Sequence, residues 1–459
     1  MMHSVIGNQI TVYEPTTALR LWTRKNLELG NPEYAKKQRM GFWLGNTPKV
    51  IRLYEDFGEK LRFPFGCFRE VREFLLQGTV EKTFQPAEKV DFEGEIPLYD
   101  YQEKAVDAMI HNVYGILQSP AGSGKTQMGL AIASRLGLKT LWLTHTKDLL
   151  DQSMKRAYQY FYAGNFGTIT EGKVDIGRTI TFATIQTMCH VDLDEYRDEW
   201  DCIIVDECHR VAGTPTAVTM FSKVLNSLRA RHKYGLSATV HRADGLIRAT
   251  TAILGQVVYN VPEHAVEEKI MPVTVLPKGT GTQLSHTCLN PDGTLNYTKM
   301  IGYLVMAPDR NWMICEDLKG NKDHYCLVLS ERVQHLRILQ AGLAERGITA
   351  HVITGKSNKT YREETLESMR KGEIHILLST YALAKEGLDI PRLDRLFLVT
   401  PQKDYAVVVQ SVGRVARRFP EKQEALVYDY VDNSPFTLYS YKTRCRHYRK
   451  IGCTFEEEA

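Results

Sequence analysis

The stretch GILQSPAGSGKT, residues 115–126, decides the fold of this chain. It reads as a short apolar strand that runs into a glycine loop, and an apolar helical pattern follows. Gly122 and Gly124 let backbone N–H groups close around phosphates. Lys125 adds positive charge, and the hydroxyl of Thr126 can bind Mg²⁺. A serine stands where the strict pattern has its first glycine, but the tail of the motif carries the essential groups. The predicted nucleotide-binding residues of the loop are Ser119, Pro120, Ala121, Gly122, Ser123, Gly124, Lys125 and Thr126.

Two carboxylates follow a second apolar strand, CIIV at residues 202–205. Open α/β sheets bind ligands at the carboxyl ends of their strands, so Asp206 and Glu207 should lie near the phosphate loop. We expect Asp206 to hold Mg²⁺ together with Thr126, and Glu207 to act as the general base on the attacking water. With Lys125, these residues predict catalytic hydrolysis of ATP, with ATP and Mg²⁺ as the bound groups.

The rest of the chain shows the same alternation of short apolar strands with amphipathic helical stretches, which is typical of parallel α/β sheets. The pattern lapses between about 260 and 320, where proline and glycine crowd together, and then resumes. Residues before about 96 instead show short alternating runs typical of a small α+β domain. We therefore predict a small domain at 1–95 and two α/β domains at 96–262 and 263–459, with a cleft between these two.

Further motifs follow in an order that makes the chain resemble superfamily-2 helicases over roughly residues 96–435. They are Ser237-Ala238-Thr239, Thr380 with EGLDIP at 386–391, and QSVGRVAR at 410–417. The resemblance implies two RecA-like domains and an ATP-driven motor on nucleic acid. It also implies that Arg414 and Arg417, on one face of a helix, are catalytic arginine fingers for the ATP γ-phosphate.

The same resemblance assigns further roles. Gln102 is expected to read adenine, and Gly387 and Asp389 to approach the nucleotide. Coupling between ATP and nucleic acid is expected from His209, Ser237, Ala238, Thr239 and Gln410. Nucleic acid is expected on the face opposite the edges that hold ATP, through phosphate contacts that do not read bases. The predicted contacts are Thr146, Lys147, Thr184, Gln186, Ser330, Arg332, Thr354, Gly355 and Thr380.

Two features narrow the resemblance within the superfamily. The segment VHRADG at 240–245 follows the Ser-Ala-Thr motif, and LGQVVY follows at 254–259. The acidic motif reads DECH and not DEAD. The chain thus looks like the XPB, RadD and phage UvsW group, most like the phage UvsW-type helicases. This resemblance implies a monomer acting on single-stranded, forked and branched DNA in replication, recombination or repair.

The N-terminal stretch carries no chemical motif, but it is rich in aromatics and bases. Some of Trp22, Phe42, Trp43, Phe63, Phe65 and Phe68 must form a small core, whereas the bases cannot. We expect this domain to grip duplex or junction DNA through phosphates, beside a motor that needs only residues from about 96 onward. Nine bases against four acids between Arg414 and Lys450 predict a second, local basic surface.

Composition excludes several other classes. The net charge is only +4, and the nine cysteines contain no C-x-x-C pair, which argues against a zinc ribbon and fits a reducing cytosol. The resemblance to phage helicases implies a bacterial or phage-infected host cytoplasm. No apolar run reaches the roughly 18 residues of a membrane span. An RNA helicase, the motor of a restriction system and a nucleotide-gated scaffold that does not hydrolyse ATP remain alternatives. Protein partners, translocation polarity and the preferred junction are not encoded in any motif.

Overall fold

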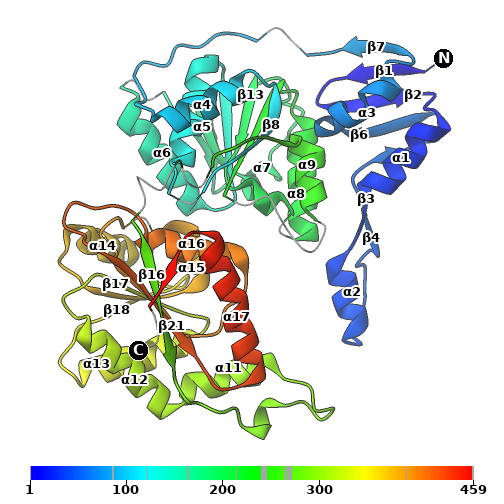
Figure 1. Ribbon diagram of the computed structural model, residues 1–459. Coiled ribbons are helices and arrows are strands. Elements are labelled where there is room, and N and C mark those ends of the chain that lie inside the picture. Colours follow the sequence, from blue (N-terminus) through cyan, green and yellow to red (C-terminus); the bar gives the residue numbers. More distant parts are fainter. Residues whose placement is uncertain are drawn as a thin grey trace. The chain divides into compact units, whose positions relative to one another are not determined.

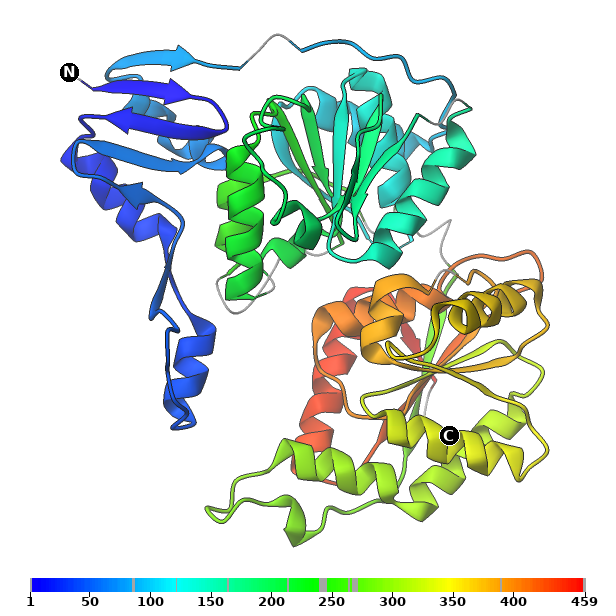
Figure 2. The ribbon, with the colours of Figure 1, turned by 180° about the vertical axis from the view of Figure 1, so that it is seen from behind.

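The computed structural model divides into two compact units (Figures 1 and 2). Unit 1 contains Met1–Pro120 and Gly124–Pro262, and unit 2 contains Ala121–Ser123 and Glu263–Ala459. The structure describes residues 2–456, apart from 85–86, 121, 163–164, 213, 239–245, 263–264, 266–270 and 389. No helix among these residues is long and apolar enough to cross a membrane.

Unit 1 begins with a five-stranded, mostly antiparallel sheet in the order β5-β6-β2-β1-β7. The strands β1 and β2 alternate buried and less buried side chains, which is what strands with one face on a core require. Helices α1 and α3 complete this small α+β layer. The elements are β1 (His3–Ile6), β2 (Gln9–Tyr13), α1 (Thr17–Leu27), β5 (Glu55–Asp56), β6 (Lys60–Pro64), α3 (Phe68–Leu75) and β7 (Thr79–Lys82).

An arm, residues 28–52, projects from this sheet (Figure 1). Its base is the antiparallel pair β3 (Glu28–Gly30) and β4 (Val50–Arg52), and α2 (Pro32–Arg39) lies beyond it. Asn31 begins α2, because its side chain accepts hydrogen bonds from the backbone of Glu33 and Tyr34 and proline follows it. No residue of α2 is buried, so the arm has no core of its own.

The small sheet is packed onto the large sheet of unit 1. Phe65 and Cys67 share one hydrophobic core with Ala249 and Ala252 of α9 (Ile247–Leu254). Arg248 of α9 reinforces the contact by an ion pair with Glu70 at 2.7 Å, and both side chains are mostly buried. Removing residues 1–95 would therefore expose the apolar face of α9 to water, and the expectation that the motor needs only residues from about 96 onward stays a prediction.

The large sheet of unit 1 has the order β11-β10-β12-β9-β13-β14-β8-β15, and only β11 pairs antiparallel. Helices α4, α5 and α6 form one layer, and α7, α8 and α9 form another. The elements are α4 (Asp100–Ile110), β8 (Tyr114–Gln118), α5 (Lys125–Leu136), β9 (Thr140–Thr144), α6 (Lys147–Tyr160), β10 (Gly167–Thr170), β11 (Lys173–Asp175), β12 (Ile180–Thr184), α7 (Ile185–Met188), β13 (Cys202–Val205), α8 (Pro215–Ser227), β14 (His232–Ser237) and β15 (Val257–Asn260).

Unit 2 is built on a seven-stranded parallel sheet in the order β18-β19-β17-β20-β21-β16-β22. One strand, β16 (Val273–Gly279), comes from the proline- and glycine-rich stretch where the sequence pattern lapses. The helices α11 (Tyr297–Met306) and α12 (Pro308–Gly320) follow it. The other elements are β17 (Cys326–Ser330), α13 (Val333–Ala344), β18 (His351–Ile353), α14 (Lys359–Lys371), β19 (Ile376–Thr380), α15 (Tyr381–Gly387), β20 (Arg395–Leu398), α16 (Tyr405–Val415), β21 (Ala425–Val431), α17 (Pro435–Lys450) and β22 (Thr454–Phe455). The fold is thus two tandem parallel α/β sheets with a small α+β sheet before them, as predicted.

Candidate active site and nucleic-acid edge

The phosphate loop connects the carboxyl end of β8 to the amino end of α5. Gly122 and Gly124 have φ angles of +83° and +82°, a left-handed conformation that favours glycine. A Cβ on Gly124 would also lie only 2.5 Å from Nε2 of Gln102. The backbone conformation therefore favours glycine at position 124, and a larger residue there would also have to displace the amide of Gln102.

Gln102 is held against this loop and is almost fully buried. Its Oε1 accepts a hydrogen bond from the backbone N–H of Tyr99 at 3.0 Å, which caps α4. The ring of Tyr99 stacks on that of Tyr101. The glutamine predicted to read adenine is thus positioned beside the phosphate loop by a capped helix and not by a flexible segment.

Asp206 and Glu207 follow β13 directly, in the centre of the sheet. The buried Asp206 accepts a hydrogen bond from the backbone N–H of Glu207 at 2.9 Å and one from Oγ of Ser153 at 3.5 Å. Glu207 has a φ of +49°, which costs free energy for a residue with a side chain. Such backbone strain is found mainly at functional sites, where the surrounding structure compensates for it.

A chain of polar contacts runs from the phosphate loop to the Ser-Ala-Thr motif. Nζ of Lys125 lies 3.9 Å from Oε1 of Glu207, whose Oε2 is 3.3 Å from Nδ1 of His209. The same Nδ1 is 3.1 Å from Oγ of Ser237 at the end of β14. The backbone N–H of Ser119 in turn donates to the carbonyl of Ser237 at 2.9 Å. The structure therefore joins the predicted base to two of the predicted coupling residues, His209 and Ser237, and to Lys125 and Ser119 of the phosphate loop.

The two carboxylates differ in their electrostatic surroundings. Burial, reinforced by the neighbouring charge of Glu207, raises the pKa of Asp206 to about 7. Burial also acts to raise the pKa of Glu207, but Lys125, His209 and Arg210 outweigh it and lower that pKa to about 2. Glu207 is therefore ionised, as a general base must be.

The residues present fit ATP with Mg²⁺. No group of three or more His, Cys, Asp or Glu side chains in the described ranges could hold a metal alone. This agrees with Mg²⁺, which is usually bound through one or two protein oxygens with phosphates and water. Thr126, in the first turn of α5, and Asp206 could supply those oxygens. Nε2 of His209 and Oε1 of Gln410 are buried and make no hydrogen bond with any described residue, so both remain able to receive a ligand.

The nucleic-acid candidates of unit 1 share the edge of the large sheet with the ATP residues. Thr146 and Lys147 follow β9, Thr184 ends β12 and Gln186 follows it, and these two strands are neighbours. The ATP residues follow β8, β13 and β14, which form the other half of the same parallel arrangement. All of these residues lie at the carboxyl edge of the sheet. Their placement therefore does not support the expectation that nucleic acid lies on the face opposite the ATP residues.

In unit 2 the equivalent candidates also gather at one edge. Ser330, Thr354 and Thr380 end or follow β17, β18 and β19, which are adjacent strands. Their hydroxyls already have local roles. Thr380 caps α15, as Thr146 caps α6 in unit 1, and the buried Ser330 lies 3.1 Å from Nδ1 of His335. Arg332 and Gly355 follow the same strands, and Gly355 is exposed.

The arginine motif lies at the end of α16. Gln410 and Arg414 are within the helix, and Nη1 of Arg414 donates to the carbonyl of Leu388 at 3.0 Å. Arg417 lies beyond the helix, which ends at Val415, so the predicted helical spacing of the two arginines is wrong. Gly387 ends α15. The predicted residues Ala121, Thr239 and Asp389 lie outside the described residues.

The basic C-terminal segment is only partly a surface. Arg444 of α17 is buried and makes paired hydrogen bonds with Asp429, at 2.8 and 2.6 Å. Lys422 donates to the carbonyls of Leu393 and Arg417, at 2.6 and 2.9 Å. These two bases therefore hold unit 2 together and cannot bind phosphate. The exposed bases of α17 are Lys442, Arg446, Arg449 and Lys450.

The N-terminal aromatics divide in a way that sequence reasoning missed. Phe63 and Phe65 are core residues, and Trp22 and Phe68 pack at its margin. Phe42 and Trp43, at the tip of the arm, are instead 61% and 89% exposed. The only sequence signal was their setting between Gly41 and Gly45, among bases.

Comparison with known proteins identifies helicase families in both units. Residues 95–242 match the family described as "Type III restriction enzyme, res subunit", and residues 309–419 match "Helicase conserved C-terminal domain". The chain is 27% identical to "Putative ATP-dependent RNA helicase L396" of Acanthamoeba polyphaga mimivirus, over 76% of this chain and 66% of that protein. It is 23% identical to "DNA 3'-5' translocase XPB2" of Sulfurisphaera tokodaii, over 79% of this chain and 89% of that one.

Two solved structures share the fold to different degrees. Dbp5 of S. cerevisiae bound to RNA and ADP BeF3 aligns with 78% of this chain and 90% of its own, with a TM-score of 0.57 and 15% identity. T4 UvsW aligns with 99% of this chain and 98% of its own, with a TM-score of 0.43 and 17% identity. The chain is a superfamily-2 helicase of the group that contains XPB and its viral relatives, and so an ATP-hydrolysing enzyme.

Proposed function

We propose that this chain is a monomeric, ATP-dependent DNA helicase or translocase that unwinds or branch-migrates forked and junction DNA, in replication, recombination or repair, in the cytoplasm. Its helicase class and its DNA-translocating relative support the motor activity. The proposed action on branched DNA depends on one observation. This observation is the arm of unit 1, with two exposed aromatic rings at its tip.

The tip of the arm is held in place by local contacts. The backbone N–H of Phe42 donates to the carbonyl of Lys37 at 2.9 Å, and Nζ of Lys37 donates to Oγ1 of Thr47 at 2.8 Å. The ring of Trp43 lies over Gly45, where a Cβ would come within 2.9 Å of it. Because the loop is already ordered, contact of the Trp43 ring with a ligand would cost little conformational entropy.

Exposed lysine and arginine side chains lie along the arm that carries these rings and at the end of α1. Aromatic side chains bind unpaired nucleobases by stacking, at about 1–3 kcal/mol per nucleobase. Lysine and arginine side chains bind the flanking phosphates. Stacking and phosphate contact are both independent of sequence. An arm of this composition suits the place where paired DNA becomes unpaired, at a fork or junction. The exposed bases of the arm and of the end of α1 are Arg24, Lys25, Lys36, Arg39, Lys49 and Arg52.

In the proposed hydrolysis, Lys125 neutralises phosphate charge and the phosphate loop binds the anion at the amino end of α5. Mg²⁺, when bound by Thr126 and Asp206, offsets the remaining phosphate charge. Glu207 accepts the proton of the attacking water. The contact from Glu207 through His209 to Ser237 then couples the state of the phosphate to the rest of the motor.

Unit 2 is proposed to complete the site. Arg414 and Arg417 would supply positive charge to the γ-phosphate, and Gly387 and Asp389 would approach the nucleotide. The gathered strand ends of each unit would bind DNA phosphates. The proposed DNA contacts are Thr146, Lys147, Thr184, Gln186, Ser330, Arg332, Thr354, Gly355 and Thr380.

The test replaces the two tip aromatics in the full chain. We expect Phe42→Ala with Trp43→Ala to lower the rate of fork unwinding at least tenfold, through loss of stacking, while ATPase activity on single-stranded DNA stays within twofold. Tyr162→Ala is the matched control, because Tyr162 is also 89% exposed in unit 1 but lies outside the arm. Unwinding of forks at the normal rate by the double variant would refute the role of the arm.

RNA is the second candidate substrate, since one relative is named as an RNA helicase and Dbp5 is solved with RNA. Contacts to phosphates alone do not distinguish the two sugars. ATPase stimulation by single-stranded DNA and RNA of the same sequence decides between them, and stronger stimulation by RNA would overturn the DNA assignment. A restriction motor, suggested by the name of the first matched family, would instead translocate along duplex DNA and show no preference for forks.

A further inference from the structure

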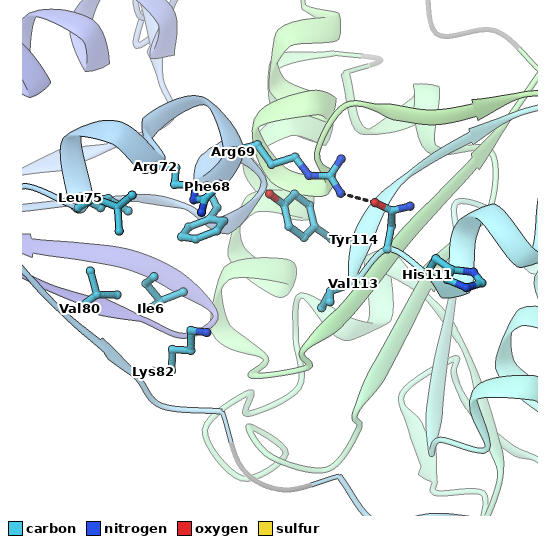
Figure 3. Close-up of a pocket in the computed structure, with 12 residues that line it drawn as sticks. Ile6, Phe68, Arg69, Arg72, Leu75, Val80, Lys82, His111, Val113 and Tyr114 are labelled. Atoms are coloured by element: carbon cyan, nitrogen blue, oxygen red, sulfur yellow. Dashed lines mark hydrogen bonds between the residues drawn. The ribbon is translucent and has the colours of Figure 1, made fainter.

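A cavity of about 630 Å³ lies in unit 1, at the seam between the small sheet and the large one (Figure 3). Its volume is within the range of cavities that bind ligands. Its walls come from three segments: the end of the small sheet, the helix α3, and the turn before β8. The apolar part of the lining consists of Ile6, Phe68, Leu75, Leu76, Val80, Val113 and Tyr114.

The cavity lies far from the ATP chemistry within its own sheet. It is bordered by Tyr114, where β8 begins, whereas the phosphate loop follows Gln118, where β8 ends. The predicted ATP and nucleic-acid residues of unit 1 that are described all follow the carboxyl ends of strands, or lie against the phosphate loop as Gln102 does. The cavity therefore belongs neither to the ATP residues nor to the predicted nucleic-acid contacts of unit 1.

All ionisable lining residues other than the tyrosine are basic: Arg69, Arg72, Lys82 and His111. The alternation of side chains in β7 and the turn of α3 explain why the charged side chains that line the cavity are all basic. In β7, alternation turns Val80 and Lys82 to the cavity, while Glu81 faces the other way and contacts His3. In α3, Arg69 and Arg72 line the cavity, whereas Glu70 turns to the opposite side and pairs with Arg248.

Part of the lining is fixed by existing contacts. The guanidinium of Arg69 lies over the ring of Tyr114, 5.0 Å from its centre, and donates to the side chain of Asn112 (Figure 3). Arg72 and Lys82 are exposed at the rim. Leu76 and Val80 remain 59% and 40% exposed although they are apolar. An apolar floor with a basic rim favours a ligand that has an apolar group and negative charges beside it.

The open edge of β7 adds a second observation. β7 is the edge strand of the small sheet and pairs with β1 on its inner side only. Thr79 and Thr83 donate their N–H groups to the carbonyls of Met2 and Ile6. Because hydrogen-bonding direction alternates along a strand, the N–H and C=O groups of Val80 and Lys82 face the outer edge. An extended peptide can add to such an edge by backbone hydrogen bonds.

We propose that this cavity docks a partner protein through an extended peptide segment that carries one bulky apolar side chain flanked by acidic residues. The apolar side chain enters between Phe68, Leu76 and Val80. The acidic residues meet Arg72 and Lys82, and the peptide backbone pairs with the edge of β7. Duplex DNA is a poorer fit, because its phosphates would lie over the apolar floor and its bases would not reach it.

The test selects peptides on the full chain from a library of random twelve-residue peptides displayed on phage. We expect enrichment of sequences with at least two Asp or Glu within four positions of a Phe, Trp, Leu, Ile or Met. One enriched peptide, labelled with fluorescein, is then measured by anisotropy. Arg72→Glu with Lys82→Glu should weaken its binding at least tenfold, because both rim charges are reversed.

Lys155→Glu with Arg156→Glu is the matched control, since it reverses two exposed bases of α6 in the same unit away from the cavity. This control should bind the peptide as the parent does, and both double variants should retain DNA-stimulated ATPase activity. Leu76→Ser, which leaves every rim charge in place, should also weaken binding. The proposal is overturned if no acidic-apolar sequence is enriched, if the rim reversal leaves binding unchanged, or if a 20-base-pair duplex displaces the peptide.

Discussion

The carboxyl edge of the large sheet in unit 1, which carries the phosphate loop, Asp206, Glu207 and Ser237, is built in the opposite way to the arm at residues 28–52. At the edge, Asp206 and Ser237 are buried, and Glu207 is held in a left-handed conformation that costs free energy. At the arm, α2 has no buried residue and Trp43 is almost fully exposed. The edge holds its groups by mutual contacts, whereas the arm presents them to solvent.

The difference reflects the chemistry proposed for each region. Hydrolysis needs atoms fixed to within a fraction of an ångström, so neighbouring residues must hold each other and few substitutions are possible. Stacking on a base and binding a phosphate tolerate many geometries and need only accessible groups. Substitutions at the edge should therefore act on turnover, and substitutions at the arm on the choice and the salt dependence of the substrate.

The largest effect is expected at Glu207. We expect Glu207→Gln to lower ATP turnover about 10³-fold, because it removes the general base while keeping the shape of the side chain. Binding of ATP, measured by equilibrium titration, should remain within a few-fold of normal. Lys125→Ala is the comparison, because it should weaken ATP binding as well as turnover. Near-normal turnover by Glu207→Gln would show that the base is elsewhere.

A smaller effect, on the coupling of hydrolysis to unwinding, is expected at Ser237 and Thr239. Ser237→Ala with Thr239→Ala removes the contact between Ser237 and His209. We expect DNA-stimulated ATPase activity to stay within about threefold, while base pairs opened per ATP fall about tenfold. The measurement is fork unwinding and phosphate release on the same substrate. An equal loss of both would place this segment in hydrolysis itself.

The arm bases should change the dependence of DNA binding on salt. Each phosphate contact contributes about 0.9 to the slope of log K against log salt concentration. We expect Lys36→Ala with Arg39→Ala to reduce that slope by about 2 for forked DNA. Lys155→Ala with Arg156→Ala, on α6, should leave it unchanged. A slope unaltered by the arm variant would mean that the arm does not contact phosphates.

The smallest effect is expected at His335 of unit 2, whose polar side chain is buried like those beside the phosphate loop and unlike those of α2 in the arm. Burial, with Arg310 nearby, lowers the pKa of His335 to about 3. Between its ordinary pKa of about 6.5 and that value, only the unfolded chain binds the proton, so the free energy of unfolding falls as pH falls. We expect this contribution to lose about 1 kcal/mol between pH 7 and pH 5.5. Urea unfolding of the parent and of His335→Gln at both pH values measures it, and an equal pH dependence of the two would contradict it.

Several features could not be predicted from sequence for identifiable reasons. The strand β16 was hidden because prolines and glycines around residues 272–281 break the apolar pattern, although parallel pairing with β21 supplies its partner. Arg417 was placed on a helix because the spacing allows it, but α16 ends at Val415. Arg444 counted as a surface base, and only its pairing with Asp429 shows that it is internal.

The sequence by itself determined the two α/β sheets and the residues around the phosphate loop, because each of these depends on local conformation and on a few obligatory chemical groups. Gly124, Lys125 and Glu207 can hardly be replaced, so they form a recognisable motif. The tertiary structure alone decided which aromatics and bases are accessible, since the same Trp or Arg serves a core or a surface equally well. Trp43 became an exposed ring and Phe63 a core ring only because β6 packs onto the seam with α9, whereas Trp43, at the tip of the arm, stays 89% exposed.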